Sequence, residues 1–232
     1  LDPATGEHFL RELQPVLAGV AHHGRLGGLT QALLKLTAPG VPDIYQGTEL
    51  WDLSLVDPDN RRPVDHAGCA TLLTGLRDEA ERRGPSAVAG DLWREPADGR
   101  AKLWLTWRAL QLRSEYPALF AAGDYLPVEA TGTRADHVVA FARVHEGEAC
   151  LVIAPRLTVG LCGWPERRLP LGGAVWDDTV LVLPDQLAGV HLVDVLTGAE
   201  LDVAPGRRTL PVATALADFP AALLIGGEEA GD

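Results

Sequence analysis

Residues 39–65 read PGVPDIYQGTELWDLSLVDPDNRRPVD, and this stretch decides how the chain is interpreted. Proline and glycine at its start interrupt the preceding helical pattern. Residues 43–47 are long enough for one short buried strand, in which Tyr45 is expected in the core and Gly47 lets the backbone turn. Residues 50–65 carry Asp, Pro, Asn and Arg without a period, which predicts an irregular loop. A loop of this length in a compact domain is usually functional or disordered.

The chain before this stretch is predicted to be helical. Apolar residues recur at helical spacing over residues 5–21, although Pro15 predicts a kink or a break there. Glycines at positions 24, 27 and 28 punctuate the pattern before residues 29–36 resume it. Adjacent His22 and His23 point in different directions on a helix, so we expect surface or capping roles for them and no metal site.

The chain after this stretch changes from helical to strand patterning. Residues 69–83 and 101–116 predict two helices, with Trp104 and Trp107 on one core-facing side of the second. A boundary is predicted at residues 121–124. Beyond it, period-two patterning predicts strands that are separated by turn residues, namely residues 137–144, 150–154, 179–183, 190–195, 208–212 and 221–225. Several short strands at this spacing are typical of an antiparallel sandwich.

Composition restricts the class of protein. Of the 232 residues, 47% are hydrophobic and 22% are charged, which indicates a globular chain. The net charge of −12 disfavours a nucleic-acid partner. Apolar runs fall short of the roughly 18 residues that cross a bilayer, so we expect no membrane partner. Three widely spaced cysteines, Cys69, Cys150 and Cys162, predict reduced packing residues in a cytoplasmic protein rather than a disulfide framework or a zinc site.

The letters of the opening stretch carry a family resemblance. Residues 39–49 resemble the segment around the last barrel strand of the α-amylase superfamily, and residues 50–65 resemble the maltooligosyl trehalose synthase family within it (glycoside hydrolase family 13). Weaker similarity to this family is found in the runs KLWLTWR at 102–108, PALF at 117–120 and GDY at 123–125, and at residues 137–143 and 219–224. The resemblance thus extends over nearly the whole chain.

The resemblance implies a fold and a reaction. The fold class would be α+β, with residues 1–121 as the C-terminal part of a (β/α)₈ barrel that carries a substrate loop at 48–65, and residues 122–232 as a β-sandwich domain. The family converts the reducing-end α-1,4 bond of a maltooligosaccharide into an α,α-1,1 bond by intramolecular transfer. The retaining mechanism uses carboxylates and no cofactor or metal.

The resemblance also implies that this chain is a fragment. The catalytic carboxylates of the superfamily precede the strand that residues 43–47 resemble, and residues 1–38 contain no matching motif. The chain starts at Leu1 and contains no methionine. We therefore predict no catalytic residues here, no transferase activity for the chain alone, and two partners: a maltooligosaccharide or α-glucan and the missing N-terminal part. Apolar surface should be exposed where that part is absent.

Seven residues of the loop are candidates for substrate binding. Carboxylates accept sugar hydroxyls and Arg guanidinium groups donate in a fixed fork, which favours Asp59 and Arg61 first and then Asp57, Asn60 and Arg62. Glu49 and Trp51 complete the set; the indole could stack on a sugar ring or fill the core beneath the loop. The alternative is a self-contained loop held by Asp–Arg pairs and Asx turns.

Two other functions fit parts of the sequence. A different α-glucan hydrolase or transferase would share the motif at residues 39–49, although the run from Asp57 to Asp65 favours the synthase family. A non-catalytic carbohydrate-binding or interaction module would use the strand region alone. Trp164 or Trp176 could then bind starch, although a lone tryptophan in a sandwich more often packs in the core.

Overall fold

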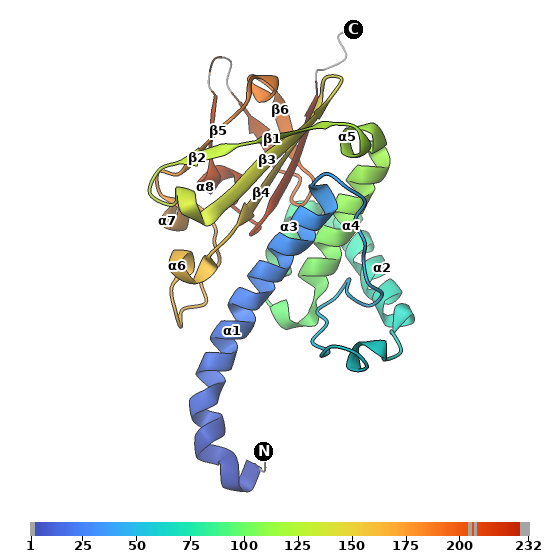
Figure 1. The fold of residues 1–232 in the computed structure, drawn as a ribbon, viewed down its shortest axis with the longest axis vertical. Helices are drawn as coiled ribbons and strands as arrows, with labels where there is room; N and C mark the ends of the chain where they lie inside the picture. Colours follow the sequence, from blue (N-terminus) through green and yellow to red (C-terminus); the bar gives the residue numbers. More distant parts are fainter. Residues whose placement is uncertain (1–2, 204–205, 207, 228–232) are drawn as a thin grey trace.

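The computed structural model describes residues 3–203, 206 and 208–227 (Figure 1). Helices occupy most of the first 121 residues, and the strands all lie in the remainder and pair antiparallel, so the predicted mixed α and β class is confirmed. The helices are α1 (Pro3–Thr37), α2 (His66–Arg83), α3 (Pro85–Asp91), α4 (Arg100–Glu115), α5 (Pro117–Ala121), α6 (Thr158–Cys162), α7 (Gly173–Trp176) and α8 (Val212–Ala215). Single 3₁₀ turns span Asp59–Arg61, Pro96–Asp98, Ala135–His137 and Asp185–Leu187.

The strands form two antiparallel sheets. They are β1 (Asp124–Pro127), β2 (Glu129–Thr131), β3 (Val138–His145), β4 (Glu148–Pro155), β5 (Val180–Val182), β6 (His191–Asp194), β7 (Glu200–Asp202), β8 (Thr209–Pro211) and β9 (Ala222–Gly227). One sheet has the order β1-β3-β4-β9-β6-β7, and the other has the order β2-β5-β8. All six predicted strands are present. Sequence reasoning missed β1, β2 and β7, most of whose side chains are exposed or half-exposed.

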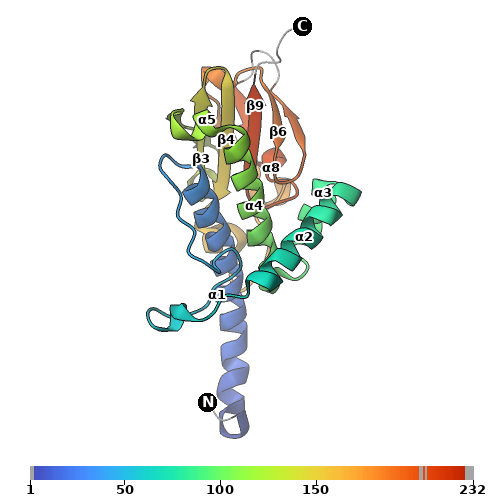
Figure 2. The same ribbon diagram turned by 90° about the vertical axis from the view of Figure 1, so that its right-hand side faces the viewer.

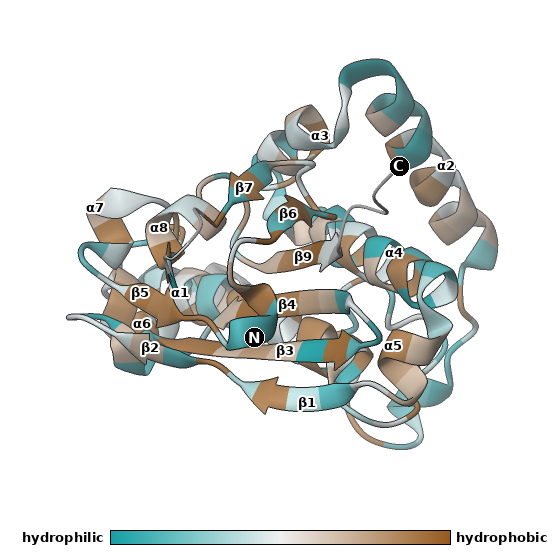
Figure 3. Cartoon of the chain, turned by 90° about the horizontal axis from the view of Figure 1, so that it is seen from above, coloured by the Kyte–Doolittle hydropathy of each residue, from teal (hydrophilic) through white to brown (hydrophobic). Residues whose placement is uncertain are grey.

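The central strands of the six-stranded sheet are buried on both faces. Along β4, Cys150 and Val152 pack against the helices α1, α4 and α5, whereas Leu151 and Ile153 point to the opposite core, which the three-stranded sheet shares. Side chains alternate between faces in a strand, so one strand serves two cores. Figure 3 shows hydrophobic residues along β3, β4 and β9 in the middle of this arrangement.

Helix α1 corrects the prediction of an interrupted helix. It continues unbroken for 35 residues with Pro15 inside it, and the three glycines do not end it. Proline removes one hydrogen bond from a helix, but Pro15 is exposed, where water can bind the freed carbonyl. The N-terminal part of α1 projects beyond the rest of the molecule in both side views (Figures 1 and 2).

Residues 43–47 correct a second prediction, because they form no strand in the described structure. The segment lacks regular structure up to Tyr45 and then enters a turn, in which the Thr48 N–H donates to the Tyr45 carbonyl at 3.0 Å. Tyr45 is 56% exposed rather than in the core, and Val41 is 97% exposed. A strand requires hydrogen-bonding neighbours, and no strand among the described residues pairs with this segment.

Buried hydrogen bonds join the helices to the sheets. The Arg143 guanidinium of β3, 2% exposed, donates to the carbonyls of Thr37, Phe120 and Gly123 at 3.1, 3.0 and 2.8 Å. The Trp104 indole donates to the Leu196 carbonyl at 3.0 Å, which confirms its predicted place in the core. These bonds fix α1, α4 and α5 to the sheet, and thereby the loop that connects α1 to α2.

The histidine pair of α1 belongs to the same junction. His22 is buried rather than at the surface, which corrects its prediction, and its Nε2 contacts the Arg168 carbonyl at 2.9 Å. His23 contacts the Thr158 hydroxyl at 2.9 Å and the Gly163 carbonyl at 3.2 Å. Both rings therefore tie the middle of α1 to the segment around α6.

Candidate substrate-binding surface

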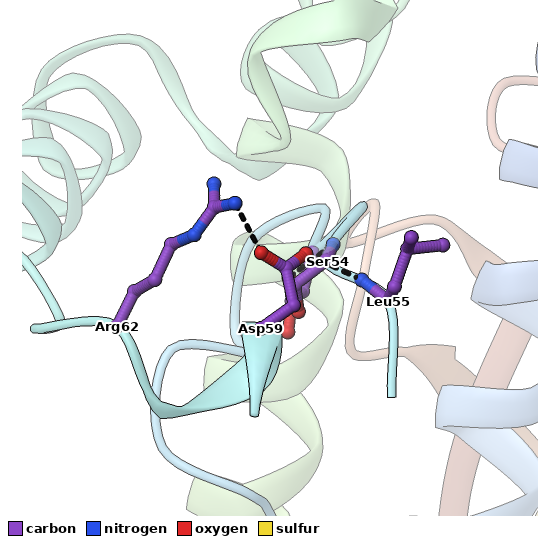
Figure 4. Close-up of polar contacts among 5 residues, drawn as sticks. Ser54, Leu55, Asp59 and Arg62 are labelled. Atoms are coloured by element: carbon purple, nitrogen blue, oxygen red, sulfur yellow. Dashed lines mark hydrogen bonds and ion pairs between the residues drawn. The ribbon is translucent and has the colours of Figure 1, made fainter. Parts of the chain in front are cut away.

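Asp59 organises the loop between α1 and α2 (Figure 4). One carboxylate oxygen accepts the backbone N–H of Leu55 at 2.8 Å, and the other pairs with Arg62. This carboxylate is 27% exposed. It holds two parts of the loop together and leaves limited surface for a ligand.

Asp57 and Arg61 form a second pair on the same loop. The Arg61 Nε lies 2.5 Å from the Asp57 carboxylate, and the Arg61 and Asp57 side chains are 70% and 54% exposed respectively. The predicted Asp–Arg pairing within the loop is therefore present. Because an exposed pair of this kind contributes little to stability, both side chains can exchange their partner for a ligand at small cost.

An Asx turn shapes the first half of the loop. The Asp52 carboxylate accepts the backbone N–H of Ser54 at 2.9 Å and its hydroxyl at 2.7 Å. These two hydrogen bonds lower the pKa of Asp52 below its ordinary value. Asp52 is thus an anion held in a fixed direction. The D-x-S spacing of this turn is visible in the sequence, yet sequence reasoning missed both residues.

Two open pockets flank the loop. The first, of about 390 Å³, is lined by Gln46, Gly47, Leu50, Trp51, Asp52, Leu53, Ser54, Asp59, Asn60, Arg62, Pro63, Val64, Asp65 and Cys69. The second, of about 530 Å³, is lined by Asp43, Ile44, Tyr45, Gln46, Asn60, Arg61, Arg62 and Val64. Both walls combine apolar side chains with carboxylates, amides and guanidinium groups, a mixture that suits a neutral, hydroxyl-rich ligand.

Asn60 lies between these pockets and lines both. Its amide oxygen is buried and has no hydrogen-bond partner within the described structure. A buried acceptor without a partner is costly. A ligand hydroxyl could satisfy it.

The predicted residues divide into three groups. Asp59, Asn60 and Arg62 line the first pocket, and Arg61 lines the second with Asp57 as its ion-pair partner. Trp51 lines the first pocket, but it is half-buried and its indole N–H donates to the Pro96 carbonyl at 2.7 Å. Glu49 lines neither pocket. The structure thus brings five polar candidates together and places Trp51 at their base.

Two of the three cysteines are buried away from the loop pockets, and Cys69 lines the first pocket. The cysteines are free thiols, and burial raises the pKa of Cys150 to about 12 and that of Cys162 to about 11. Among the described residues, His, Cys, Asp and Glu form no group of three that could hold a metal ion. The same residues include no helix with the length and apolarity needed to span a membrane.

The two tryptophans of the strand region differ. Trp176 is fully buried and donates to the Pro170 carbonyl at 2.8 Å, so it is a core residue. Trp164 is 44% exposed, and its ring stacks on His23 with the ring centroids 6.0 Å apart. Gly19 lies directly beneath that ring, with no room for a side chain. Trp164 therefore packs against α1 with part of its surface open.

Comparisons with known proteins show which enzymes this chain resembles. A maltooligosyl trehalose synthase of Mycobacterium tuberculosis is 41% identical over 225 residues, which cover 97% of this chain and 24% of that protein. The structure of maltooligosyltrehalose synthase from Arthrobacter ramosus has a TM-score of 0.70 and 39% identity, covering 92% of this chain and 24% of that one. The chain is a relative of the maltooligosyl trehalose synthases. No family model matches it.

The resemblance seen in the sequence is thereby confirmed. The chain spans about a quarter of the length of the curated maltooligosyl trehalose synthases it matches. An α-amylase from Anoxybacillus shares the fold, with a TM-score of 0.53 at 18% identity. The alternative of another α-glucan enzyme is therefore not favoured over a maltooligosyl trehalose synthase.

Proposed function

We propose that this chain is the C-terminal portion of a maltooligosyl trehalose synthase and supplies one wall of its substrate site. In this proposal residues 1–121 complete a (β/α)₈ barrel, and residues 122–232 form a β-sandwich that braces it; the two ends of the chain lie outside the described residues. The observation that carries the proposal is the convergence of Asp59, Asn60, Arg61 and Arg62 on two adjoining pockets in a relative of this enzyme.

The loop would bind the sugar rather than break its bond. The buried amide oxygen of Asn60 would accept a ligand hydroxyl, and the Arg61 guanidinium would donate to ring or hydroxyl oxygens once released from Asp57. The parent enzyme would isomerise the reducing-end α-1,4 bond to an α,α-1,1 bond. Contacts that hold the released glucose unit while it turns would favour transfer over attack by water.

The catalytic carboxylates would come from the preceding part of the parent protein. Three observations support this division. The loop acids are engaged in turns and ion pairs, residues 43–47 lack strand neighbours, and the projecting part of α1 exposes Phe9, Leu17 and Val20 by 52–57%. A barrel packed against α1 would cover these side chains and supply the neighbouring strands. We place the parent enzyme in the cytoplasm.

Substitution of Arg61 tests the proposal in the complete enzyme. Arg61→Ala removes charge-assisted hydrogen bonds worth about 1.5–3 kcal/mol, so we expect kcat/KM for maltopentaose to fall by about 10- to 100-fold. The matched control is Arg208→Ala, which removes an exposed arginine paired with Asp185 at 2.6 Å in the strand region. That variant should stay within about twofold of the parent.

Two results would contradict the proposal. Equal kcat/KM for the Arg61 variant and the parent enzyme would remove Arg61 from the substrate site. Formation of trehalose-ended product from maltopentaose by the purified 232-residue chain would show that the catalytic carboxylates lie within it.

A further inference from the structure

The Trp51 side chain fills a closely fitted site between α1 and the start of α4. A Cβ atom at Gly28 of α1 would lie 3.0 Å from the indole ring, and one at Gly99 would lie 3.0 Å from the Trp51 backbone nitrogen. The indole N–H donates to the Pro96 carbonyl. Contacts at the helix, the ring edge and the backbone therefore fix this residue from three directions.

Lys102 of α4 contacts the same segment at Leu50 and Trp51. Its ammonium donates to the Leu50 carbonyl at 3.1 Å and lies 5.6 Å from the centroid of the Trp51 ring. Such a cation over an indole face is attracted to the ring electrostatically. Burial, chiefly, and the charge of Lys35 lower the pKa of Lys102, while the carboxylates of Asp52 and Glu49 act in the opposite direction.

The segment that Lys102 holds is a thin wall. Trp51, Asp52 and Leu53 line the loop pocket on one side, and on the other they line a pocket of about 380 Å³ that Lys102 and α1 complete. Leu53 is 90% exposed and adds little packing of its own. Displacement of this wall would move Asp52 and Ser54 relative to Asp59, and hence change the shape of the loop pocket.

We propose that Lys102 is a positioning residue for the substrate loop, acting through the Leu50 carbonyl and the Trp51 ring. It touches no ligand in this proposal. Its ammonium fixes the wall formed by residues 50–54, and this wall sets the direction of the Asp52–Ser54 turn into the pocket. The inference rests on the proposed function for its catalytic consequence, but the anchoring itself is a property of this chain.

The chain offers a matched test, because its two lysines are Lys102 and the exposed Lys35. Lys102→Met keeps the length of the stem and removes the charge and the donor, whereas Lys102→Arg keeps both. Amide hydrogen exchange of the 232-residue chain should accelerate by about tenfold in residues 46–64 for Lys102→Met. Lys102→Arg and Lys35→Met should remain within about threefold of the unsubstituted chain, and β3 and β4 should be unchanged in all three variants.

An independent substitution disturbs residues 50–54 from the side of α1. Gly28→Ala pushes a methyl group against the indole, so it should accelerate exchange in the same residues while Lys102 is intact. Unchanged exchange in the Lys102→Met chain would overturn the anchoring. Acceleration in β3 and β4 to the same degree would also overturn it, since the lysine would then support the whole fold.

The catalytic consequence is measured in the complete enzyme. Lys102→Met should raise KM for maltopentaose by about tenfold with a smaller fall in kcat, and Lys102→Arg should restore most of the loss. A loosened loop with unchanged KM would overturn the positioning role. Absence of maltooligosaccharide conversion by the unsubstituted enzyme would instead refute the proposed function, and the exchange result would still stand.

Discussion

The two halves of α1 carry apolar side chains at the same helical spacing, but the chain buries only one of them. In the C-terminal half, Leu26, Leu29, Leu33 and Leu36 are at most 1% exposed. In the N-terminal half, the apolar side chains Phe9, Val16, Leu17 and Val20 are 47–57% exposed. Helical periodicity therefore identifies the face of a helix that packs against something, but it does not identify the segment or the protein that covers that face.

The difference in burial between the two halves of α1 shows which of them contributes to the stability of this chain. Each fully buried leucine contributes roughly 1.5–3 kcal/mol by removal from water, and the C-terminal half also receives hydrogen bonds, such as that from Arg113 to the Leu36 carbonyl at 2.8 Å. The N-terminal half depends on helix propensity, which is marginal for a segment of this length in water. Its apolar face fits the proposal that a larger enzyme surrounds it.

Truncation of one leucine in each half gives the largest expected effect. Leu33→Ala creates a cavity in the core and should lower the free energy of unfolding by about 2–5 kcal/mol. Leu17→Ala, with the same change in chemistry, should alter it by less than about 0.5 kcal/mol. Urea unfolding of both variants measures the contrast. Equal losses would mean that the N-terminal half packs within this chain.

We expect His22, in the middle of α1, to have an intermediate and pH-dependent effect on the free energy of unfolding. Burial, chiefly, and the charges of His23, Arg167 and Arg25 lower the pKa of His22 below 6.5, despite its contact with the Arg168 carbonyl. The neutral ring is thus the stabilising form. Its contribution is complete above pH 6.5 and is lost as the pH falls from 6.5 through the lowered pKa of the folded chain.

His22→Gln removes this titration while retaining a hydrogen-bond donor. We expect the unsubstituted chain to lose more unfolding free energy than the variant when the pH is lowered from about 8 to about 5. Urea unfolding of both chains at the two pH values measures the difference. Parallel pH profiles would exclude His22 as the source of the acid sensitivity.

Pro15→Ala should have the smallest global effect and a clear local one. Proline in a helix interior costs about 3 kcal/mol relative to alanine, but the exposed half can open without disturbing the core. Hydrogen exchange should slow in residues 8–20, while the global unfolding free energy changes by less than about 0.5 kcal/mol. A large global gain would show that both halves unfold as one unit.

The sequence predicted the regular elements of this fold better than their environment. Residues 101–116 were placed as a helix with Trp104 in the core, and six of the nine described strands were found, because these elements bury apolar side chains within the chain. Tyr45 and His22 were misplaced for one shared reason. Their burial depends on neighbours distant in sequence, which a local pattern does not specify.

The candidate site divides in the same way. The residue types in the loop, with Asp59, Asn60 and Arg62 close together, are readable from the sequence, as is the general possibility of Asp–Arg pairs. The choice of partners, Asp57 with Arg61 and Asp59 with Arg62, comes from the structure. The roles of Trp51 and Lys102 cannot be read from the sequence, because these residues are far apart in the chain and meet only when α4 packs beside α1.

The sequence by itself determined the family, the longer helices, six of the nine described strands and the chemical character of the loop, because these depend on residue identity and short-range order. Only the tertiary structure decided which half of α1 is buried, that residues 43–47 are not a strand, and which side chains hold the loop in place. Burial and long-range hydrogen bonding are properties of the assembled chain, so they become visible only when distant segments meet.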